Sequence, residues 1–275
     1  MNHLSKHNIL FSSQHGFRER HSTCSNLLES VCDWTRNIEN KHGTLVAYVD
    51  FQKAFDKVSY FKLIHKLKHI DIRGKLLDCI SSFLHGRSQR VKVGNDTSCE
   101  VSLISGVPQG SVLGPVLFII YVNDIVHNQP AGSISKLYAD DLKSYIVERN
   151  FQALNETNPF VDLLKHVNDW SVKWQLSVAG KKCQWMRFSY KKASNEGDEL
   201  FNLGLDVLEE TTEVTDLGLL FTNTLNFHRH IVGICGKAKS LIFLLRKRFL
   251  SKNAYYLILA YKSYILPVLN YCSPV

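Results

Sequence analysis

The sequence lacks the cysteine pattern of a disulfide-rich or zinc-binding protein. Its seven cysteines are an odd number, are scattered over 275 residues, and include no C-x-x-C pair. Such spacing argues against a disulfide framework and against a zinc site. No charged-then-apolar signal segment opens the chain. We therefore expect a soluble protein with reduced thiols that works inside the cell, in the nucleus, the cytoplasm or both.

A long uninterrupted apolar segment is also missing. The longest apolar run, residues 112–122, is interrupted by Gly114 and Pro115. Its length of about 11 residues is well below the roughly 20 that a membrane-spanning helix needs. The hydrophobic content of 45% is nevertheless sufficient for one large domain or two modest ones. The sequence thus predicts a protein with a substantial core and no membrane partner.

Acidic residues are absent after Asp216. Residues 217–275 carry eight of the 33 lysines and arginines and no acid, so the other 25 basic residues are balanced by all 25 acids in residues 1–216. The eight basic residues are Arg229, Lys237, Lys239, Arg246, Lys247, Arg248, Lys252 and Lys262. A basic segment rich in Leu, Ile and Phe suits a phosphate backbone or an anionic membrane surface. A solvated helix face is the alternative interpretation.

The spacing of the apolar residues predicts a mixture of helices and strands. Helical periodicity is expected to give helices over residues 22–41, 61–70, 75–84, 112–125 and 160–174. A continuous apolar run predicts a buried strand at 44–50. Alternating residues predict hairpins around 94–96 and over 136–147, a strand pair including 184–190, and short strands over 206–221. Polar residues predict a loop near 191–199. The order strand–helix–strand–strand–helix–strand is that of a split βαβ sheet.

Two adjacent carboxylates stand in the middle of the second hairpin. Asp140 and Asp141 interrupt the alternating apolar pattern of KLYADDLKSYIV, although strands disfavour aspartate. Asp50 ends the apolar strand TLVAYVD, and pairing of that strand beside the hairpin would bring three carboxylates together. Three carboxylates in one place need a counter-charge, which hard divalent cations supply. Turn aspartates without a metal are the alternative interpretation.

Several motifs resemble one known family. In chain order they are QHGFRERHST, VDFQKAFDKV, SGVPQGSVLGPVLFIIYVNDI, YADDLKSY, WSVKWQLSVAGKKCQWMRF, VTDLGLLFTNTLNFHRHI and LILAYKSYILPVLNYCSPV. Together they are similar to the reverse transcriptase domain of non-LTR (LINE-type) retrotransposons over nearly the whole chain. The resemblance implies RNA-templated DNA synthesis on an α+β right-hand polymerase fold, with a palm made of an antiparallel sheet and helices of the split βαβ type.

The resemblance also implies roles for individual residues. It assigns two Mg²⁺ ions, with Mn²⁺ as a substitute, to the catalytic residues Asp50, Asp140 and Asp141. The implied nucleotide-binding residues are Phe55, Gln109, Gly110 and Lys182. The implied nucleic-acid-binding residues are Lys237, Lys239, Arg246, Lys247 and Arg248. The implied partners are an RNA template, a DNA primer and dNTPs, with no protein partner.

Some of these residues also have plain structural interpretations. The ring of Phe55 would exclude a ribose 2′-OH and so favour deoxynucleotides, whereas a core phenylalanine predicts no preference between sugars. Gly110 is by default a turn glycine, and Lys182 is by default a surface lysine. Ala179 departs from the asparagine that is usual in the family at this position.

The resemblance divides the chain into three parts. Residues 1–43 match partial fingers, residues 44–216 the palm with the metal-binding site, and residues 217–275 the start of a basic helical thumb. Fingers and palm are interleaved over 61–104. Compared with the family, the chain is expected to be truncated at both ends. Two functions follow: the core of an RNA-directed DNA polymerase, which is a nucleotidyltransferase, or a catalytically inactive nucleic-acid-binding remnant of such an element.

Three other polar residues have a local signature. His65 and His69 are four residues apart, so a metal clamp is one interpretation and a solvated basic helix face is the other. Asp124 is expected to be a structural acid at a helix end.

Overall fold

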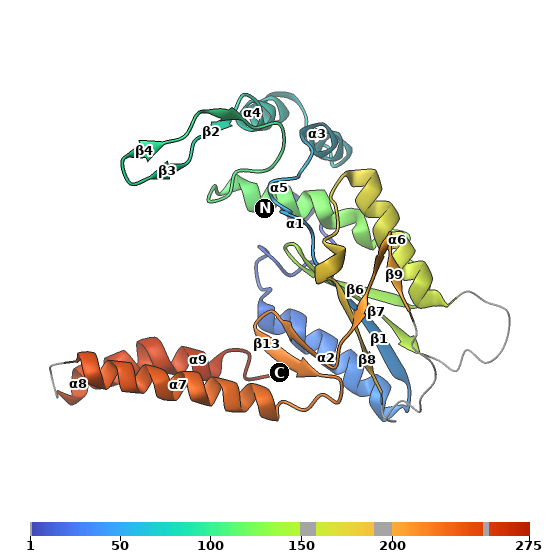
Figure 1. Ribbon diagram of the computed structural model, residues 1–275. Coiled ribbons are helices and arrows are strands. Elements are labelled where there is room, and N and C mark those ends of the chain that lie inside the picture. The colour runs from blue at the N-terminus through green and yellow to red at the C-terminus, as the bar shows by residue number, and fades with distance from the viewer. Residues whose placement is uncertain (1, 149–157, 190–199, 250–252) are drawn as a thin grey trace.

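A five-stranded sheet forms the centre of the molecule in the computed structural model, which describes residues 2–148, 158–189, 200–249 and 253–275 (Figure 1). Its strand order is β11-β8-β1-β7-β6. The strands are β1 (Gly43–Val49), β6 (Ser133–Tyr138), β7 (Asp141–Glu148), β8 (Gln184–Phe188) and β11 (Glu209–Glu210). Neighbours are antiparallel except for β11 and β8, which are parallel. The four long strands thus lie in the order fourth, first, third, second, as in a split βαβ sheet, and the predicted α+β class is confirmed.

Helices α5 (Leu113–Val122) and α6 (Pro159–Trp174) supply much of the largest core, on the face of the sheet that carries Leu45 and Leu142. Most residues of α5 are buried and all but Gly114 and Pro115 are apolar, so the helix is apolar on every side. Such a helix is stable only in an interior position. A 3₁₀ helix, η1 (Asn123–Val126), continues the chain after α5.

Helix α2 (Thr23–Glu39) and the hairpin of β12 (Glu213–Asp216) and β13 (Leu219–Thr222) cover the other face. The α2 residue Trp34 is fully buried there. Its ring centroid lies 4.5 Å from that of Phe188, 5.6 Å from that of Phe221 and 5.9 Å from that of Tyr145. One helix residue therefore joins β8, β7 and the β12–β13 hairpin in a second core.

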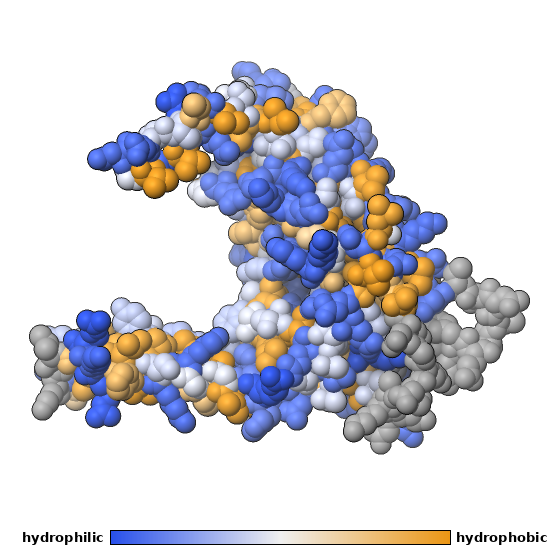
Figure 2. Space-filling view, in the orientation of Figure 1, coloured by the Kyte–Doolittle hydropathy of each residue, from blue (hydrophilic) through white to orange (hydrophobic). Residues whose placement is uncertain are grey.

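Two parts of the chain extend beyond this sheet on the same side (Figure 1). The upper part holds α3 (Tyr60–His69), α4 (Gly74–Leu84), and the short strands β2 (Ser88–Gln89), β3 (Lys92–Val93), β4 (Asp96–Thr97) and β5 (Val101–Ser102). The lower part, which we call the helical arm, holds α7 (His228–Arg248), α8 (Ala254–Ala260), the π-helical turn η3 (Tyr261–Ile265) and α9 (Leu266–Asn270). The space-filling view shows an open hollow between them (Figure 2).

The remaining elements are short. They are α1 (Asn2–Lys6), η2 (Gly180–Lys182), β9 (Asn202–Leu203) and β10 (Asp206–Val207). None of the described helices is long and apolar enough to cross a membrane.

Most predicted elements are present, with two differences. The helix expected over 112–125 is α-helical only as far as Val122 and then tightens into the 3₁₀ helix η1, where the Asn123 side chain bonds to the backbone of Ile9 and Phe11. The hairpin around 94–96 is divided into two short ladders, β2–β5 and β3–β4. The strand within 184–190 pairs with β1 and β11. The loop predicted at 191–199 lies outside the described residues.

Candidate functional site

The sheet brings Asp50 and Asp141 to the same end of two neighbouring strands. β1 and β7 are antiparallel, and their register runs from Gly43 opposite Glu148 to Val49 opposite Leu142. One further step in this register sets Asp50 level with Asp141. Directly opposite residues in an antiparallel pair have Cα atoms roughly 4.5–5.5 Å apart. The strand pairing expected from the sequence is therefore present.

Asp140 lies in the tight turn between β6 and β7. The last pair of this hairpin is Tyr138 with Asp141, so the turn consists of Ala139 and Asp140 alone. Ala139 has a φ of 57°, in the left-handed region. A positive φ at the first turn residue is typical of the turns that match strand twist, and that position favours glycine. An alanine there needs external support, because the left-handed conformation costs roughly 1–2 kcal/mol.

The carboxylates affect each other's protonation. Desolvation by the surrounding protein raises the pKa of Asp141 to about 6, although part of the side chain remains accessible to solvent. The negative charges of Asp140, Asp216 and Asp50 add to this increase. Burial and, to a smaller extent, Asp50 raise the pKa of Asp140. These mutual effects indicate that the three predicted carboxylates share one electrostatic environment, which a cation would stabilise.

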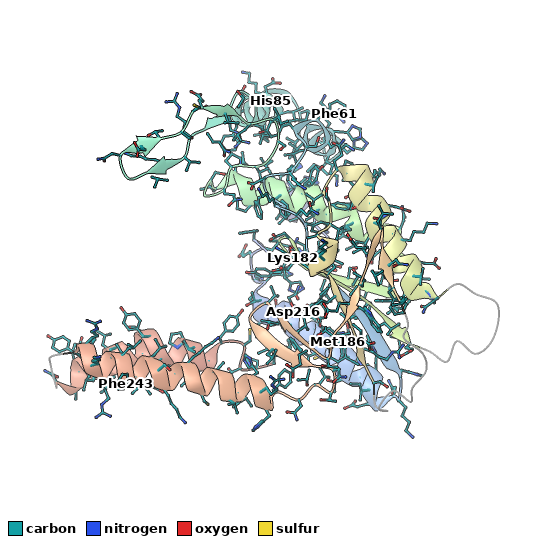
Figure 3. The ribbon with its side chains drawn as sticks, in the orientation of Figure 1. Phe61, His85, Lys182, Met186, Asp216 and Phe243 are labelled. Carbon is teal, nitrogen blue, oxygen red and sulfur yellow. The ribbon has the colours of Figure 1, made fainter. Side chains whose placement is uncertain are left out.

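Lysine side chains provide positive charge beside the carboxylates. The Lys182 Nζ lies 3.6 Å from Oδ2 of Asp50, and the Lys182 side chain is 75% exposed. The Lys143 Nζ lies 2.5 Å from Oδ2 of Asp216, and both of these side chains are buried. In Figure 3, Lys182 and Asp216 lie near the inner wall of the hollow. Ala179 accepts the Lys182 N–H at 2.7 Å and donates its own N–H to the Asp50 carbonyl at 2.7 Å, so the backbone of this turn is tied to the end of β1.

Two cavities open beside Asp50. The smaller, of about 220 Å³, is bordered by Asp50, Asp141, Lys182 and Asp216 among others. The larger, of about 690 Å³, is bordered by Asp50 and by four lysines: Lys53, Lys57, Lys181 and Lys182. Asp206 borders the larger cavity as well, so four lysines there face two carboxylates. This balance suits an anionic ligand that carries a metal ion.

The carboxylate oxygens are the kind of ligand that a hard divalent cation binds. Their arrangement, however, does not form a complete coordination site. Mg²⁺ and Mn²⁺ bind carboxylate oxygens, and a bound ion would keep Asp140 and Asp141, whose pKa values are raised, in the ionised form. Within the described ranges, no group of three His, Cys, Asp or Glu side chains is arranged so that it could hold a metal ion. Water and phosphate oxygens commonly complete the coordination of Mg²⁺, so an incomplete protein ligand set is compatible with this ion.

The other predicted nucleotide-binding residues lie on adjoining loops. The ring of Phe55 is half-buried and stacks on Phe118, with centroids 4.2 Å apart. Gln109 is exposed and donates from Nε2 to the Asp56 carboxylate at 3.1 Å. Gly110 has a φ of 79° and open space where a Cβ would stand. The segments that carry Phe55 and Gln109 therefore lie side by side.

The predicted nucleic-acid-binding residues all belong to the helical arm. Lys237, Lys239, Arg246, Lys247 and Arg248 lie on α7 and are exposed. The same helix exposes Ile231, Val232, Ile242, Phe243 and Leu244. Its surface is thus both basic and apolar.

His65, His69 and Asp124 lie away from the carboxylates Asp50, Asp140 and Asp141 in sequence and have separate surroundings. His65 and His69 border a cavity of about 800 Å³ together with His3, His7 and His127. No metal-holding group is present there among the described side chains. Asp124 accepts from Lys66 at 2.5 Å and from the Trp170 indole at 2.8 Å, which confirms its predicted structural role.

Sequence reasoning missed several residues beside the carboxylates. Lys143 could have been found, since it is two residues after Asp141 on a strand and so points to the same face. Its partner Asp216 is 73 residues away in sequence, which no local pattern reveals. Gln14, whose side chain contacts the turn at Ala139, carried no signal beyond its place in a family motif.

Fold and site together define an α+β protein with a carboxylate cluster at one end of a split βαβ sheet. The family described as "Reverse transcriptase (RNA-dependent DNA polymerase)" matches residues 1–221. The chain belongs to this family.

Curated relatives agree with this membership. The chain is 29% identical over 227 residues to the RNA-directed DNA polymerase from mobile element jockey of Drosophila funebris, covering 80% of the chain and 24% of that protein. It is 28% identical over 239 residues to the probable RNA-directed DNA polymerase from transposon BS of Drosophila melanogaster, covering 83% and 25%. The chain therefore spans about a quarter of the length of these relatives.

Solved telomerase structures have a similar fold. Apo telomerase from Candida tropicalis, truncated from its C-terminal domain, has a TM-score of 0.54 at 15% identity, over 82% of this chain and 42% of that one. Telomerase from Candida albicans has a TM-score of 0.51 at 11% identity, over 88% and 42%. At this level of identity the similarity concerns the fold.

Proposed function

We propose that this chain is the core of an RNA-directed DNA polymerase. In this proposal residues 44–216 are the palm, residues 1–43 with the upper extension around 61–104 are fingers, and residues 217–275 begin a basic thumb. The observation that carries the proposal is the meeting of Asp50, Asp140 and Asp141 at one end of the sheet in a member of the reverse transcriptase family.

The carboxylates would act through divalent cations. Two Mg²⁺ ions, or Mn²⁺, when bound to Asp50, Asp140 and Asp141 would supply charge stabilisation for the attacking and leaving oxygens of phosphoryl transfer. In this proposal the pairing of β1 with β7 and the two-residue turn between β6 and β7 keep the three carboxyl groups together. The primer 3′-OH is the proposed nucleophile, the α-phosphorus of a dNTP is the proposed electrophile, and pyrophosphate is the leaving group.

The lysines of the larger cavity would hold the nucleotide. Lys182 lies 3.6 Å from Asp50, and Lys53, Lys57 and Lys181 border the same cavity. Four ammonium groups would orient a triphosphate, and Lys182 can donate a proton to the departing pyrophosphate. Phe55, Gln109 and Gly110 are proposed to contact the sugar and base of the same nucleotide.

The RNA template and DNA primer would occupy the hollow between the upper extension and the helical arm (Figure 2). The arm has basic residues and no acid from Leu217 onward, so its α7 helix suits duplex backbone.

The setting that we infer is intracellular, because the seven cysteines are all free thiols.

A second candidate is a nucleic-acid-binding protein without turnover. One observation favours it: the described carboxylates do not form a group that could already hold a metal ion. The basic arm alone would be sufficient for salt-dependent binding.

One preparation of the chain tests both candidates. Primer extension on an RNA template with Mg²⁺ and dNTPs is measured beside binding of the same primer–template, for wild type and Asp140→Asn. We expect extension by wild type, and loss of extension with retained binding in the variant. Salt-dependent binding without any extension by wild type would favour the second candidate, and equal extension by both proteins would exclude the proposed site.

A further inference from the structure

We infer that Gln14 is a positioning residue for the turn that carries Asp140, and that it sets the affinity of the carboxylates for divalent cations. This inference rests on the proposed function of those carboxylates. Gln14 belongs to the segment Ser13–Gly16, which lies far from the turn in sequence but directly against it in space.

The segment extends the central sheet past its edge strand. Gln14 forms a parallel bridge with Leu137 of β6. The Leu137 N–H donates to the Ser13 carbonyl at 2.9 Å, and the His15 N–H donates to the Leu137 carbonyl at 2.8 Å. The outer edge of β6 is therefore paired with the backbone of this segment just before the turn at Ala139.

The side-chain amide of Gln14 reaches the turn itself. Its Oε1 accepts the N–H of Ala139 at 3.1 Å and the N–H of Gly16 at 2.7 Å. Its Nε2 is 3.5 Å from the Ala139 carbonyl, at the outer limit of a hydrogen bond. Gln14 is 1% exposed, so water does not compete for these contacts. A single amide thus contacts the main chain on both sides of the Ala139 Cα.

Glycine at position 16 is needed for this approach. A Cβ built on Gly16 would stand 2.4 Å from the Ala139 nitrogen and 3.1 Å from the Gln14 Oε1. The first distance is one that real Cβ atoms do not show, so the backbone of the turn would have to move, and the second would require a small shift of the Gln14 side chain. The segment is therefore pressed against the turn with no room for a side chain between them.

The turn needs such support because Ala139 has a positive φ of 57°. Alanine leaves this region readily in the absence of other restraints, since the left-handed conformation costs it roughly 1–2 kcal/mol. Strained backbone persists where the surrounding structure over-determines it, and such places are often functional. The Gln14 amide supplies a restraint on the residue directly before Asp140.

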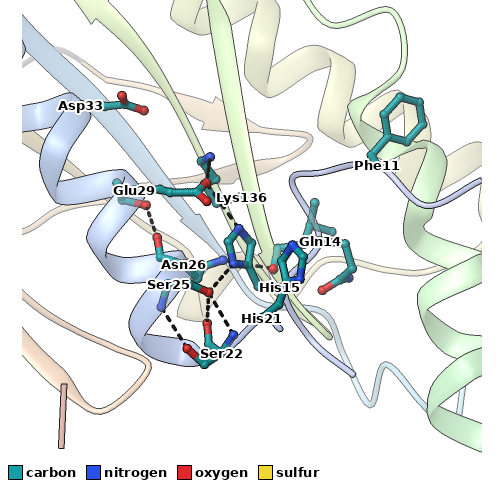
Figure 4. Close-up of polar contacts among 12 residues, drawn as sticks. Phe11, Gln14, His15, His21, Ser22, Ser25, Asn26, Glu29, Asp33 and Lys136 are labelled. Carbon is teal, nitrogen blue, oxygen red and sulfur yellow. Dashed lines mark hydrogen bonds and ion pairs between the residues drawn. The ribbon is translucent and has the colours of Figure 1, made fainter. Parts of the chain in front are cut away.

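Neighbouring side chains fix the segment to helix α2 (Figure 4). His15 is buried, with its Nδ1 2.9 Å from the Ser25 hydroxyl and its Nε2 3.4 Å from the Glu29 carboxylate. Asn26 donates from Nδ2 to the Leu137 carbonyl at 3.0 Å. The restraint on Ala139 is therefore anchored in the core and not in a free loop.

The test compares two chemically identical substitutions in the whole chain. Gln14→Leu removes the contacts with Ala139. Gln129→Leu is the control, because Gln129 donates to Ser135 at 2.6 Å, in the half of β6 that is farther from the turn. Both variants lose an amide that bonds to the same strand, but Gln14 is buried and Gln129 is half-buried. The comparison therefore depends on local readouts at the turn and not on overall stability.

Three readouts are measured. Hydrogen exchange of the Ala139 amide reports the restraint, titration with Mn²⁺ followed by electron paramagnetic resonance reports cation affinity, and single-nucleotide incorporation separates kcat from KM. For Gln14→Leu we expect faster Ala139 exchange and about 10- to 100-fold weaker Mn²⁺ binding, the range usual for residues that orient metal ligands. We expect kcat to fall similarly while KM for dNTP changes little. Gln129→Leu should match wild type in all three.

Equal Ala139 exchange or equal Mn²⁺ affinity in Gln14→Leu and Gln129→Leu would overturn the inference. A wild-type chain that does not incorporate nucleotides would contradict the proposed function instead. The exchange and Mn²⁺ measurements would still decide whether Gln14 positions the turn.

Discussion

The Nζ atom of Lys143 lies 2.5 Å from Oδ2 of Asp216, and the two side chains are only 4% and 8% exposed. The pair joins β7, which begins with Asp141, to β12 of the hairpin on the α2 side of the sheet. Lys143 also lies over the Trp34 ring, 5.8 Å from its centroid. A buried ion pair thus connects the carboxylate end of the sheet to the element that leads into the helical arm.

Removal of one partner of this pair should destabilise the fold strongly. We expect Lys143→Met to lower the free energy of unfolding by about 3–5 kcal/mol, because Asp216 would remain buried without a counter-charge. The double variant with Asp216→Leu should regain most of the loss, since two apolar side chains need no partner. Urea unfolding of wild type, both single variants and the double variant measures this cycle, and additive losses would contradict a direct pairing.

Lys182 should contribute to nucleotide binding and not to stability. Its side chain is 75% exposed beside Asp50, so Lys182→Gln should leave the unfolding transition nearly unchanged. The KM for dNTP should rise, by about 10-fold, from the loss of a charge-assisted contact with the triphosphate. Lys75→Gln, which removes another exposed charge, from α4, is the control. Equal KM values for the two variants would contradict the assignment of Lys182.

Phe55 offers a test of sugar selection. If its ring excludes the ribose 2′-OH, Phe55→Val should raise the use of rNTPs relative to dNTPs by at least about 10-fold. Phe118→Val breaks the same ring stack from the buried side and should lower stability without changing the ratio. An unchanged ratio in Phe55→Val would mean that the residue serves the core alone.

Lys66 makes the stability depend on pH. Burial lowers the pKa of Lys66 to about 8, whereas the value in an unfolded chain is 10.5. Between these values the unfolded chain binds more protons, so stability rises with pH from 8 to 10.5 and is lost as pH falls through 8. The difference between these two pKa values corresponds to on the order of 3 kcal/mol in the free energy of unfolding. Lys66→Met should abolish this dependence, so the difference between wild type and variant in urea unfolding at pH 7 to 10 isolates it. A difference independent of pH would contradict the lowered pKa.

The helical arm should contribute to the salt dependence of nucleic-acid binding. Replacement of Arg246, Lys247 and Arg248 by Gln should reduce the slope of log K against log salt by about 2 to 3, if each residue contacts one phosphate. The control replaces three other exposed basic residues outside both extensions: Arg36, Lys41 and Lys165. A larger change in the control than in the arm variant would move the binding surface away from the arm.

Local patterns predicted the elements that form the site. The strand ending at Asp50 and the hairpin around Asp140 are encoded by short-range alternation and by apolar content, so both were visible in the sequence. The pairing of the strand with the hairpin follows from the element order strand–helix–strand–strand–helix–strand of a split βαβ sheet. The resemblance to a family then supplied chemistry that alternation alone leaves open.

Long-range contacts could not be predicted in the same way. The bond between Gln14 and Ala139 spans 125 residues, and the pair of Lys143 and Asp216 spans 73. Neither has a periodic signal, because each depends on where separate elements meet. The change from α-helix to 3₁₀ helix at Asn123 likewise coincides with bonds between the Asn123 side chain and a distant N-terminal segment, which no local pattern reveals.

The most direct measurement of the central claim is single-turnover incorporation of one dNTP on an RNA template, at saturating Mg²⁺, by four variants. These are Asp50→Asn, Asp140→Asn, Asp141→Asn and the control Asp78→Asn, whose side chain is exposed on α4. We expect each of the first three to lose about 100-fold or more in rate, because each would remove a ligand of the ions that stabilise the transition state. Asp78→Asn should equal wild type. A rate near that of wild type in any of the first three would contradict the three-carboxylate site.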